Sequence, residues 1–210
     1  MRVDYACFEQ VFGCKTLKHK EKIKIVDIAF ITMQDLKIQQ PELFINQLSE
    51  ETLKYQFLRI FEHNFNRVMN LTTEYIDYKE DVNYNRTGTD MKYVGVTIGD
   101  NGRTLFDLVI HQRGIGNRQY PENLIHFEFK GFNDNQQAIN ADKTRLALTT
   151  MGNIDPLIVP NGYMQFENLK YIRGYQLGLF LHFSENAISN VAAYSNGKKI
   201  VYRYINRSLT

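Results

Sequence analysis

The chain has 210 residues, 43% of them hydrophobic and 13% aromatic, and its 25 basic and 23 acidic side chains leave a formal net charge of +2 at pH 7. This composition is typical of a globular domain that buries a hydrophobic core, and it excludes a disordered or fibrous chain. The small net charge neither requires nor excludes a polyanionic partner.

No apolar stretch approaches the roughly 18 residues that a membrane helix needs. The first ten residues contain Asp4 and Glu9 and lack the apolar segment of a signal peptide. Cys7 and Cys14 have no partners at zinc-ligand spacing, so we interpret them as small hydrophobic residues in a reducing compartment. We therefore expect a cytoplasmic chain with no membrane partner.

Residues 1–40 contain the lysine-rich segment KTLKHKEKIK (15–24), which overlaps IKIVDIAFITM (23–33). The second segment is rich in β-branched residues, which predicts a strand. The lysines indicate either a solvated face or a contact with a DNA backbone. We treat residues 1–40 as an N-terminal extension of unassigned structure and residues 41–210 as the main domain.

Residues 41–69 predict one long helix or two short ones. Apolar residues recur there at three- and four-residue spacing and form a stripe for a core: Leu53, Phe57, Ile60, Phe61, Phe65 and Val68. Ser49 is a suitable N-cap. At about 100° per residue, Glu50 projects onto the middle of the stripe and Glu51 onto its edge. Glu50 is therefore an acid on a face that should be buried.

Strand patterns follow at 79–86, 91–99, 104–112 and 123–131, with a turn at GDNG (99–102) and a loop at GIGNRQYPE (114–122). A helix is predicted over 135–151 and a strand over 174–184. NVAAYS and KKIVYRYI, joined by NGK, predict a closing hairpin. This order predicts an α/β (α+β) fold in which helices flank a mixed central β-sheet.

Charged residues interrupt two of these apolar strands. Because side chains alternate between the faces of a strand, Glu128 and Lys130 share one face, about 7 Å apart. Asp107 reaches the same face if its strand pairs with theirs. A solvated cross-strand ion pair is the alternative, but both strands are nearly apolar on this face as well, which favours a buried site.

Two carboxylates and a lysine in one place suit a hard divalent cation such as Mg²⁺ or Mn²⁺, which prefers carboxylate oxygens. Such a cation can polarise a phosphate and generate hydroxide from a bound water. The lysine can hold that water or balance the charge that develops on the phosphate.

FDLVIH (106–111) and LIHFEFKG (124–131) together resemble the motif of the PD-(D/E)xK nuclease superfamily, which has a restriction-endonuclease-like fold. Phe106 stands where the proline of the motif would be. The resemblance implies that Asp107 and Glu128 bind metal, aided by the main-chain carbonyl of Phe129. It also implies that Lys130 positions the attacking water or stabilises the transition state. Glu50 would be a supporting ligand, with Glu51 as the alternative.

Further segments are similar to small bacterial members of this superfamily: LSEETLKYQFLRIFE (48–62), VNYNR (82–86), DKTRLALTT (142–150) and YQLGLFLHF (175–183). Asn83 takes the place of an acid in the second of them. The resemblance covers about residues 48–184 and implies a core of mixed sheet and helices.

Several other residues carry weaker signals. GIGNRQ (114–119) lacks the lysine and serine of a phosphate-binding loop and predicts a turn. His111 and His126 lie on the predicted active face, either as ordinary, partly buried histidines or as contacts to phosphate or water. Arg86, Lys143 and Arg145 are either phosphate contacts or exposed charges.

The resemblance implies a Mg²⁺- or Mn²⁺-dependent nuclease that hydrolyses phosphodiester bonds, with DNA as the expected partner. A homodimer would suit the cutting of both strands. One alternative is a catalytically inactive nucleic-acid-binding or protein-interaction module of the same fold. The other is a metal-binding or scaffold protein that is not a nuclease.

Overall fold

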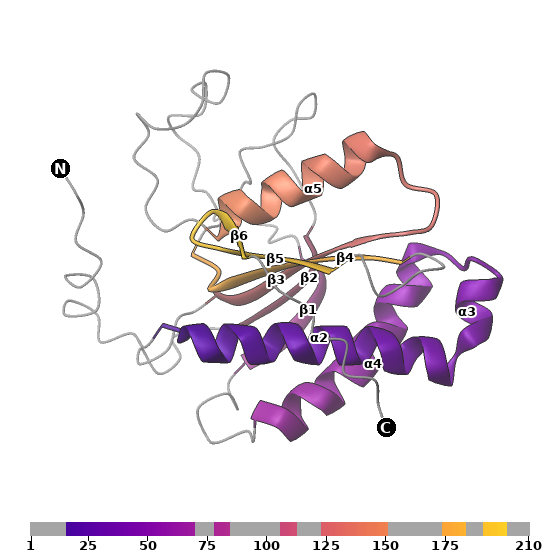
Figure 1. The fold of residues 1–210 in the computed structure, drawn as a ribbon, viewed down its shortest axis with the longest axis horizontal. Coiled ribbons are helices and arrows are strands. Elements are labelled where there is room, and N and C mark those ends of the chain that lie inside the picture. Colours follow the sequence, from indigo (N-terminus) through magenta and orange to yellow (C-terminus); the bar gives the residue numbers. More distant parts are fainter. Residues whose placement is uncertain are drawn as a thin grey trace.

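The structure is a computed structural model, and it describes residues 16–69, 78–84, 106–112, 123–150, 174–183 and 191–200 (Figure 1). The helices are α2 (His19–Gln39), α3 (Pro41–Ile45), α4 (Glu50–Met69) and α5 (Gln136–Thr149). The strands are β1 (Tyr78–Tyr84), β2 (Phe106–Gln112), β3 (Asn123–Lys130), β4 (Leu177–His182), β5 (Val191–Ser195) and β6 (Lys198–Ile200). None of the described helices combines the length and apolar character that a membrane span requires.

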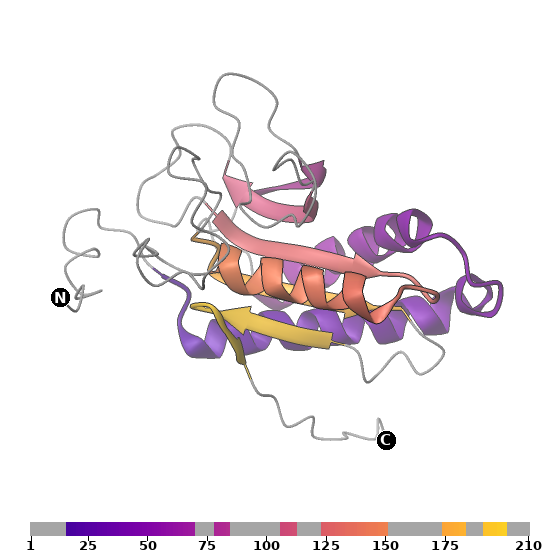
Figure 2. The ribbon, with the colours of Figure 1, turned by 90° about the horizontal axis from the view of Figure 1, so that it is seen from above.

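The described strands form one six-stranded sheet in the order β1-β2-β3-β4-β5-β6. Neighbouring strands are antiparallel except β3 and β4, which are parallel and are separated in the chain by α5. Helix α5 covers one face of the sheet, and α2 and α4 cover the other (Figures 1 and 2). The predicted α+β class, with a mixed sheet flanked by helices, is confirmed.

The two faces of β3 and β4 differ in chemistry. Alternate residues of both strands, among them Phe127 and Phe129, join the large core beneath α2 and α4. The Phe57 ring of α4 lies 5.3 Å from the Phe129 ring, and the Phe61 ring lies 5.1 Å from the Phe127 ring. Aromatic packing of this kind fixes α4 on the sheet. Helix α5 covers the opposite face of the sheet.

The strand predicted over residues 23–33 is wrong, because these residues belong to helix α2. Buried residues recur along α2 at helical spacing: Ile25, Ala29, Thr32 and Leu36. Packing of this face against α4 and the core overrides the strand preference of β-branched residues. Residues 19–39 therefore lie against the main core, although the sequence left them in an extension of unassigned structure.

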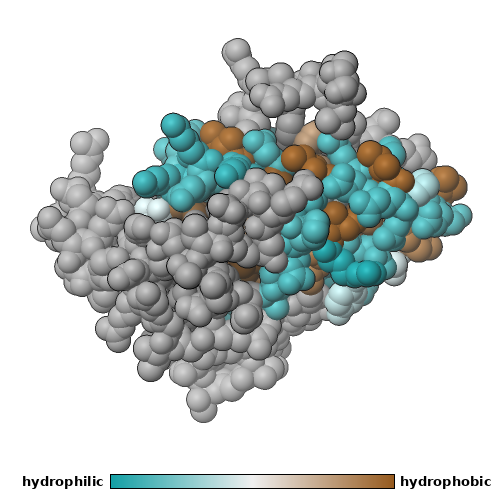
Figure 3. All heavy atoms as spheres, turned by 90° about the horizontal axis from the view of Figure 1, so that it is seen from below, coloured by the Kyte–Doolittle hydropathy of each residue, from teal (hydrophilic) through white to brown (hydrophobic). Residues whose placement is uncertain are grey.

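Lys20, Lys22 and Lys24 of the 15–24 segment lie on the first turns of α2, and Lys18 is its N-cap residue. Lys18, Lys20 and Lys24 are exposed, and Lys22 Nζ donates a hydrogen bond to Ser195 Oγ at 2.8 Å. Seen from the side of α2 and α4, the described surface is mostly hydrophilic with scattered hydrophobic residues (Figure 3).

Residues 41–69 form two helices as one alternative expected, but only α3, with 5 residues, is short, and α4 has 20 residues. Gln47, with φ of 46°, adopts a left-handed conformation between α3 and α4. Ser49 caps α4 as expected, because its Oγ accepts a hydrogen bond from the Thr52 N–H at 3.3 Å. Glu50 is consequently the first residue of α4, at the end of the helix nearest the end of β3.

Most of the other predicted elements are confirmed within a few residues, namely β1, β2, β3, α5, β4 and the β5–β6 hairpin. Asn196 and Gly197 form the hairpin turn with φ of 51° and 74°, as Asn-Gly favours. The strand predicted over 91–99, the GDNG turn and the 114–122 loop lie outside the described residues.

Gly178 of β4 permits the close approach of α5. A Cβ at this position would lie 3.0 Å from Thr150 Cγ2 and 3.2 Å from Leu146 Cδ2. A Cβ at Gly131 would meet its nearest atoms only at 3.7 Å.

We expect Gly178→Ala to lower the free energy of unfolding by about 1–3 kcal/mol, because the added methyl overpacks the α5–β4 contact. Gly131→Ala is the matched control and should change it by less than about 1 kcal/mol. Urea unfolding followed by circular dichroism measures both. Equal effects of the two substitutions would contradict the close packing of α5.

Candidate active site

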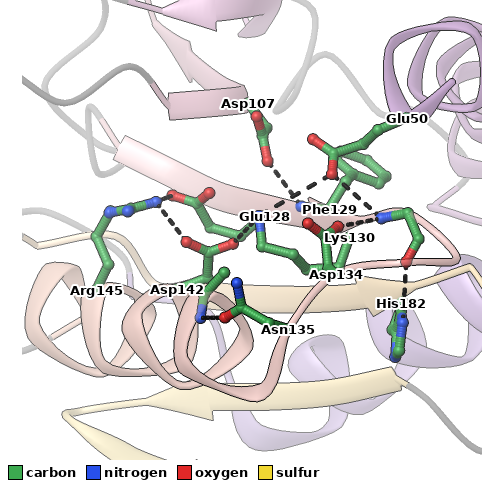
Figure 4. Close-up of polar contacts among 12 residues, drawn as sticks. Glu50, Asp107, Glu128, Phe129, Lys130, Asp134, Asn135, Asp142, Arg145 and His182 are labelled. Atoms are coloured by element: carbon green, nitrogen blue, oxygen red, sulfur yellow. Dashed lines mark hydrogen bonds and ion pairs between the residues drawn. The ribbon is translucent and has the colours of Figure 1, made fainter.

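The predicted site residues lie where β2 and β3 separate, close to the start of α4 and beneath α5 (Figure 4). The β2–β3 ladder places Val109 opposite His126 and ends at Leu108 opposite Phe127. Side-chain alternation therefore puts Asp107 on the same face as His126 and Glu128. Just beyond the ladder, the Phe129 N–H donates a hydrogen bond to Asp107 Oδ2 at 2.8 Å. The Asp107 carboxylate is thus fixed between the two strands.

Helix α4 supplies a cation to Asp107. Lys54 is 2% exposed, and its Nζ lies 3.2 Å from Asp107 Oδ1 and 2.9 Å from Glu51 Oε2. Burial alone would lower the pKa of Lys54, but Asp107 and Glu51 raise it above the usual value. Lys54 is therefore charged at neutral pH and compensates Asp107.

Glu128 is the most deeply buried carboxylate of the site, at 1% exposed. Arg145 of α5 donates from Nη1 to Glu128 Oε1 at 2.7 Å, and His126 Nε2 lies 2.9 Å from the same oxygen. Burial raises the pKa of Glu128 well above its usual range, whereas Arg145 acts in the opposite direction. The guanidinium is thus the main group that favours the ionised carboxylate.

His126 is fully buried and neutral, because burial and then the nearby Arg145 hold its pKa well below the usual range. Its Nδ1 lies 2.8 Å from Thr149 Oγ1. A neutral ring that donates from Nε2 to Glu128 accepts at Nδ1 from the Thr149 hydroxyl. His126 therefore supports Glu128 through a hydrogen bond without adding charge.

Lys130 lies between two carboxylates. Its Nζ lies 2.6 Å from Asp142 Oδ2 and 4.0 Å from Glu50 Oε2. Burial would lower the pKa of Lys130, but Asp142 and Glu50 raise it above the usual value, so the ammonium form is present at neutral pH. Asp142 also contacts Arg145, through Oδ1 at 3.0 Å.

Glu50 approaches the end of β3 from the first turn of α4. The Gly131 N–H donates to Glu50 Oε2 at 3.2 Å and to Asp134 Oδ2 at 2.7 Å. Burial and the repulsion of Asp107 raise the pKa of Glu50 to about 7. The Glu51 side chain is 47% exposed and contacts Lys54. Glu50, rather than the alternative Glu51, faces the other site residues.

The described side chains of the site carry more negative than positive charge. Five acids, Glu50, Asp107, Glu128, Asp134 and Asp142, surround three bases, Lys54, Lys130 and Arg145, which gives a formal charge of −2 when all are ionised. Coulombic repulsion from Asp107 raises the pKa of both Glu50 and Glu128. Carboxylates that repel one another in a partly buried place have the chemistry of ligands for a hard divalent cation.

In the described conformation, Asp107 and Glu128 each have an internal cation as a partner. Lys54 contacts Asp107 and Arg145 contacts Glu128. Among the described residues, no three His, Cys, Asp or Glu side chains gather closely enough to hold a metal ion as they stand. The donor chemistry thus fits a divalent cation, which would share the carboxylates with these internal cations.

The sequence analysis missed four members of the site, namely Lys54, Asp134, Asp142 and Arg145. Lys54 lies four residues after Glu50 on the apolar face of α4, and that spacing was a usable signal. Asp142 and Arg145 are three residues apart and face the sheet with Leu146. Arg145 was expected to be a phosphate contact or an exposed charge; instead its side chain is 13% exposed and paired with Glu128.

The structure also describes some of the other residues that carried weaker signals in the sequence. His111 is 5% exposed, and His126 is fully buried rather than partly buried. Lys143 Nζ lies 4.8 Å from the centre of the Phe180 ring. Asn83 belongs to β1, and its side chain lies outside the described residues, as do Arg86, Cys7 and Cys14.

The shifted pKa of Glu50 makes stability depend on pH. The carboxyl titrates at 4.5 when unperturbed and at about 7 in the folded chain. The folded state thus binds the proton more tightly, so the stability linked to protonated Glu50 is full below about 4.5 and is lost as the pH rises through about 7.

Without added metal, we expect Glu50→Gln to raise the free energy of unfolding by about 1 kcal/mol more at pH 8 than at pH 5. This value is below the full shift because solvent screens a partly exposed side chain. Urea unfolding at both pH values, in EDTA, measures the difference. Glu62→Gln, which removes an exposed carboxylate from the same helix, is the control, and a Glu50→Gln effect that does not change with pH would contradict the assignment.

Comparison of the chain with protein-family models, with curated proteins and with solved structures gives no match. No family is therefore shown for this chain by overall similarity. The arguments for a function come from the motif in the sequence and from the geometry of the site.

Proposed function

We propose that this chain is a divalent-metal-dependent nuclease of the PD-(D/E)xK type, with DNA as its substrate. The observation that carries the proposal is the meeting of Asp107, Glu128 and Lys130 at one end of two adjacent strands, with Glu50 of α4 beside them. Carboxylates that can hold a divalent cation and an ammonium beside them suit metal-assisted phosphodiester hydrolysis.

The arrangement of elements adds support. An antiparallel β1-β2-β3 meander, a helix over the sheet and a parallel β4 beside β3 follow α4 in the chain. The implied restriction-endonuclease-like core has Asp107 on the second of these strands and the Glu-x-Lys pair on the third.

Each residue has a role in this proposal. Asp107 and Glu128 would hold the cation, with the main-chain carbonyl of Phe129 and with Glu50 as a supporting ligand. The bound cation would supply Lewis-acid polarisation of the phosphate and a nucleophile from water. The Lys130 ammonium, held in its charged form by Asp142, would orient the attacking water or stabilise charge on the phosphate.

One observation favours a second function, a nucleic-acid-binding or protein-interaction module that no longer cuts. Lys54 and Arg145 already compensate Asp107 and Glu128, so these buried carboxylates do not need a metal to be tolerated. In that case the carboxylates would keep their internal partners and would bind no cation.

We expect Mn²⁺- or Mg²⁺-dependent cleavage of plasmid or single-stranded DNA by the wild-type chain. Glu128→Gln and Lys130→Met should each lower the rate by at least about 100-fold, since each removes a charge that acts in the transition state. EDTA should abolish cleavage. Glu62→Gln is the control for one lost carboxylate and should cut like the wild type.

Cleavage that survives both Glu128→Gln and Lys130→Met would place the activity at a different site or in a contaminant. A wild-type chain that binds DNA in EDTA, cuts no DNA in either metal and shows no heat of Mn²⁺ binding would support the non-cutting module.

A further inference from the structure

A continuous chain of alternating charges joins β3 to α5. It runs from Glu50 through Lys130, Asp142 and Arg145 to Glu128, with each neighbouring pair at 4.0 Å or less. Three of its members, Glu50, Glu128 and Lys130, are residues of the proposed reaction, and two, Asp142 and Arg145, come from a helix that contributes no reacting group. Figure 4 shows the α5 pair directly across from the β3 pair.

Arg145 fixes the orientation of Glu128. The guanidinium and His126 both contact Oε1, so one carboxylate oxygen is held by two side chains. The other oxygen is turned away from Arg145, toward the side where Asp107 lies (Figure 4). A carboxylate held by one oxygen presents the second in a constant direction, as a metal ligand must.

Asp142 fixes Lys130. One carboxylate serves both cations, because Oδ1 contacts Arg145 and Oδ2 contacts Lys130. A lysine side chain loses much rotamer freedom when it is held, so an isolated ammonium would not keep one position. The Asn135 side chain caps α5 by accepting a hydrogen bond from the Ala138 N–H at 2.9 Å, which fixes the start of the helix that carries Asp142.

We propose that Asp142 and Arg145 are a positioning pair, in which Arg145 aims one Glu128 oxygen at the cation site and Asp142 holds the Lys130 ammonium beside it. The inference rests on the proposed function, because a metal and a phosphate are what Glu128 and Lys130 would meet. A purely structural role explains less. Buried ion pairs rarely stabilise a fold more than well-packed apolar residues of the same volume.

The proposed positioning of Glu128 by Arg145 is tested by calorimetric titration of Mn²⁺ into the wild type, Arg145→Met and Arg145→Lys, with no substrate present. Loss of the guanidinium should weaken Mn²⁺ binding by at least about tenfold, as the loss of an outer partner of a metal ligand does. Arg145→Lys should recover part of that loss, because it restores charge without the planar group. Lys143→Met, which removes the neighbouring cation of α5, should bind Mn²⁺ like the wild type.

Each result distinguishes a positioning role of Arg145 from a purely structural one. Wild-type affinity in a folded Arg145→Met protein would overturn the role of Arg145 and leave the proposed nuclease standing. Absence of Mn²⁺ binding by the wild type would overturn both proposals. If circular dichroism shows that Arg145→Met does not fold, Arg145→Lys decides alone: weaker Mn²⁺ binding supports positioning, and unchanged binding overturns it.

The proposed positioning of Lys130 by Asp142 is tested by chemical acetylation of lysines in metal-free protein, with mass spectrometry of each peptide. Asp142→Asn keeps the shape of the side chain and removes the charge that holds Lys130. We expect Lys130 to be acetylated several-fold faster in this variant while the rate at Lys143 stays constant. An unchanged rate at Lys130 in the folded variant would overturn the role of Asp142.

Discussion

A carboxylate inside a covered strand is costly unless paired or hydrogen-bonded groups compensate it, and Glu128 imposes this constraint on everything around it. The helix that covers this face of β3 cannot be apolar along its whole length, so α5 brings Arg145 to the carboxylate. A buried guanidinium between strand and helix needs more than one acceptor, and Asp142 provides the second. Asp142 in turn holds Lys130, and one buried charge thereby organises the site.

The two faces of β3 have different roles in the fold. Phe127 and Phe129 join the aromatic core with α4 and hold the strand still. Glu128 lies between them in the sequence and Lys130 follows Phe129, and both carry charge on the α5 side. Close packing on the first face makes the charged groups on the second rigid, because a packed core does not allow the strand to shift.

Two chains of alternating charge converge where β2 and β3 separate. Helix α4 contributes Lys54 to Asp107, and α5 contributes Arg145 to Glu128. Each carboxylate of the proposed metal site therefore has an internal cation as its partner in the described conformation. A divalent cation would share the carboxylates with these partners, which makes the affinity of the site a property of α4 and α5 as much as of the strands.

The sequence by itself determined the parts that depend on local periodicity. Alternation along two strands placed Asp107, Glu128 and Lys130, and helical spacing placed Glu50, because these patterns involve neighbours only a few residues apart. The helical state of residues 23–33 was decided by tertiary packing, which overrode β-branched residues. Arg145 reaches Glu128 across 17 positions of sequence. The contact between them depends on how α5 crosses the sheet and on the β3–β4 register. Neither of these produces a periodic pattern in the sequence.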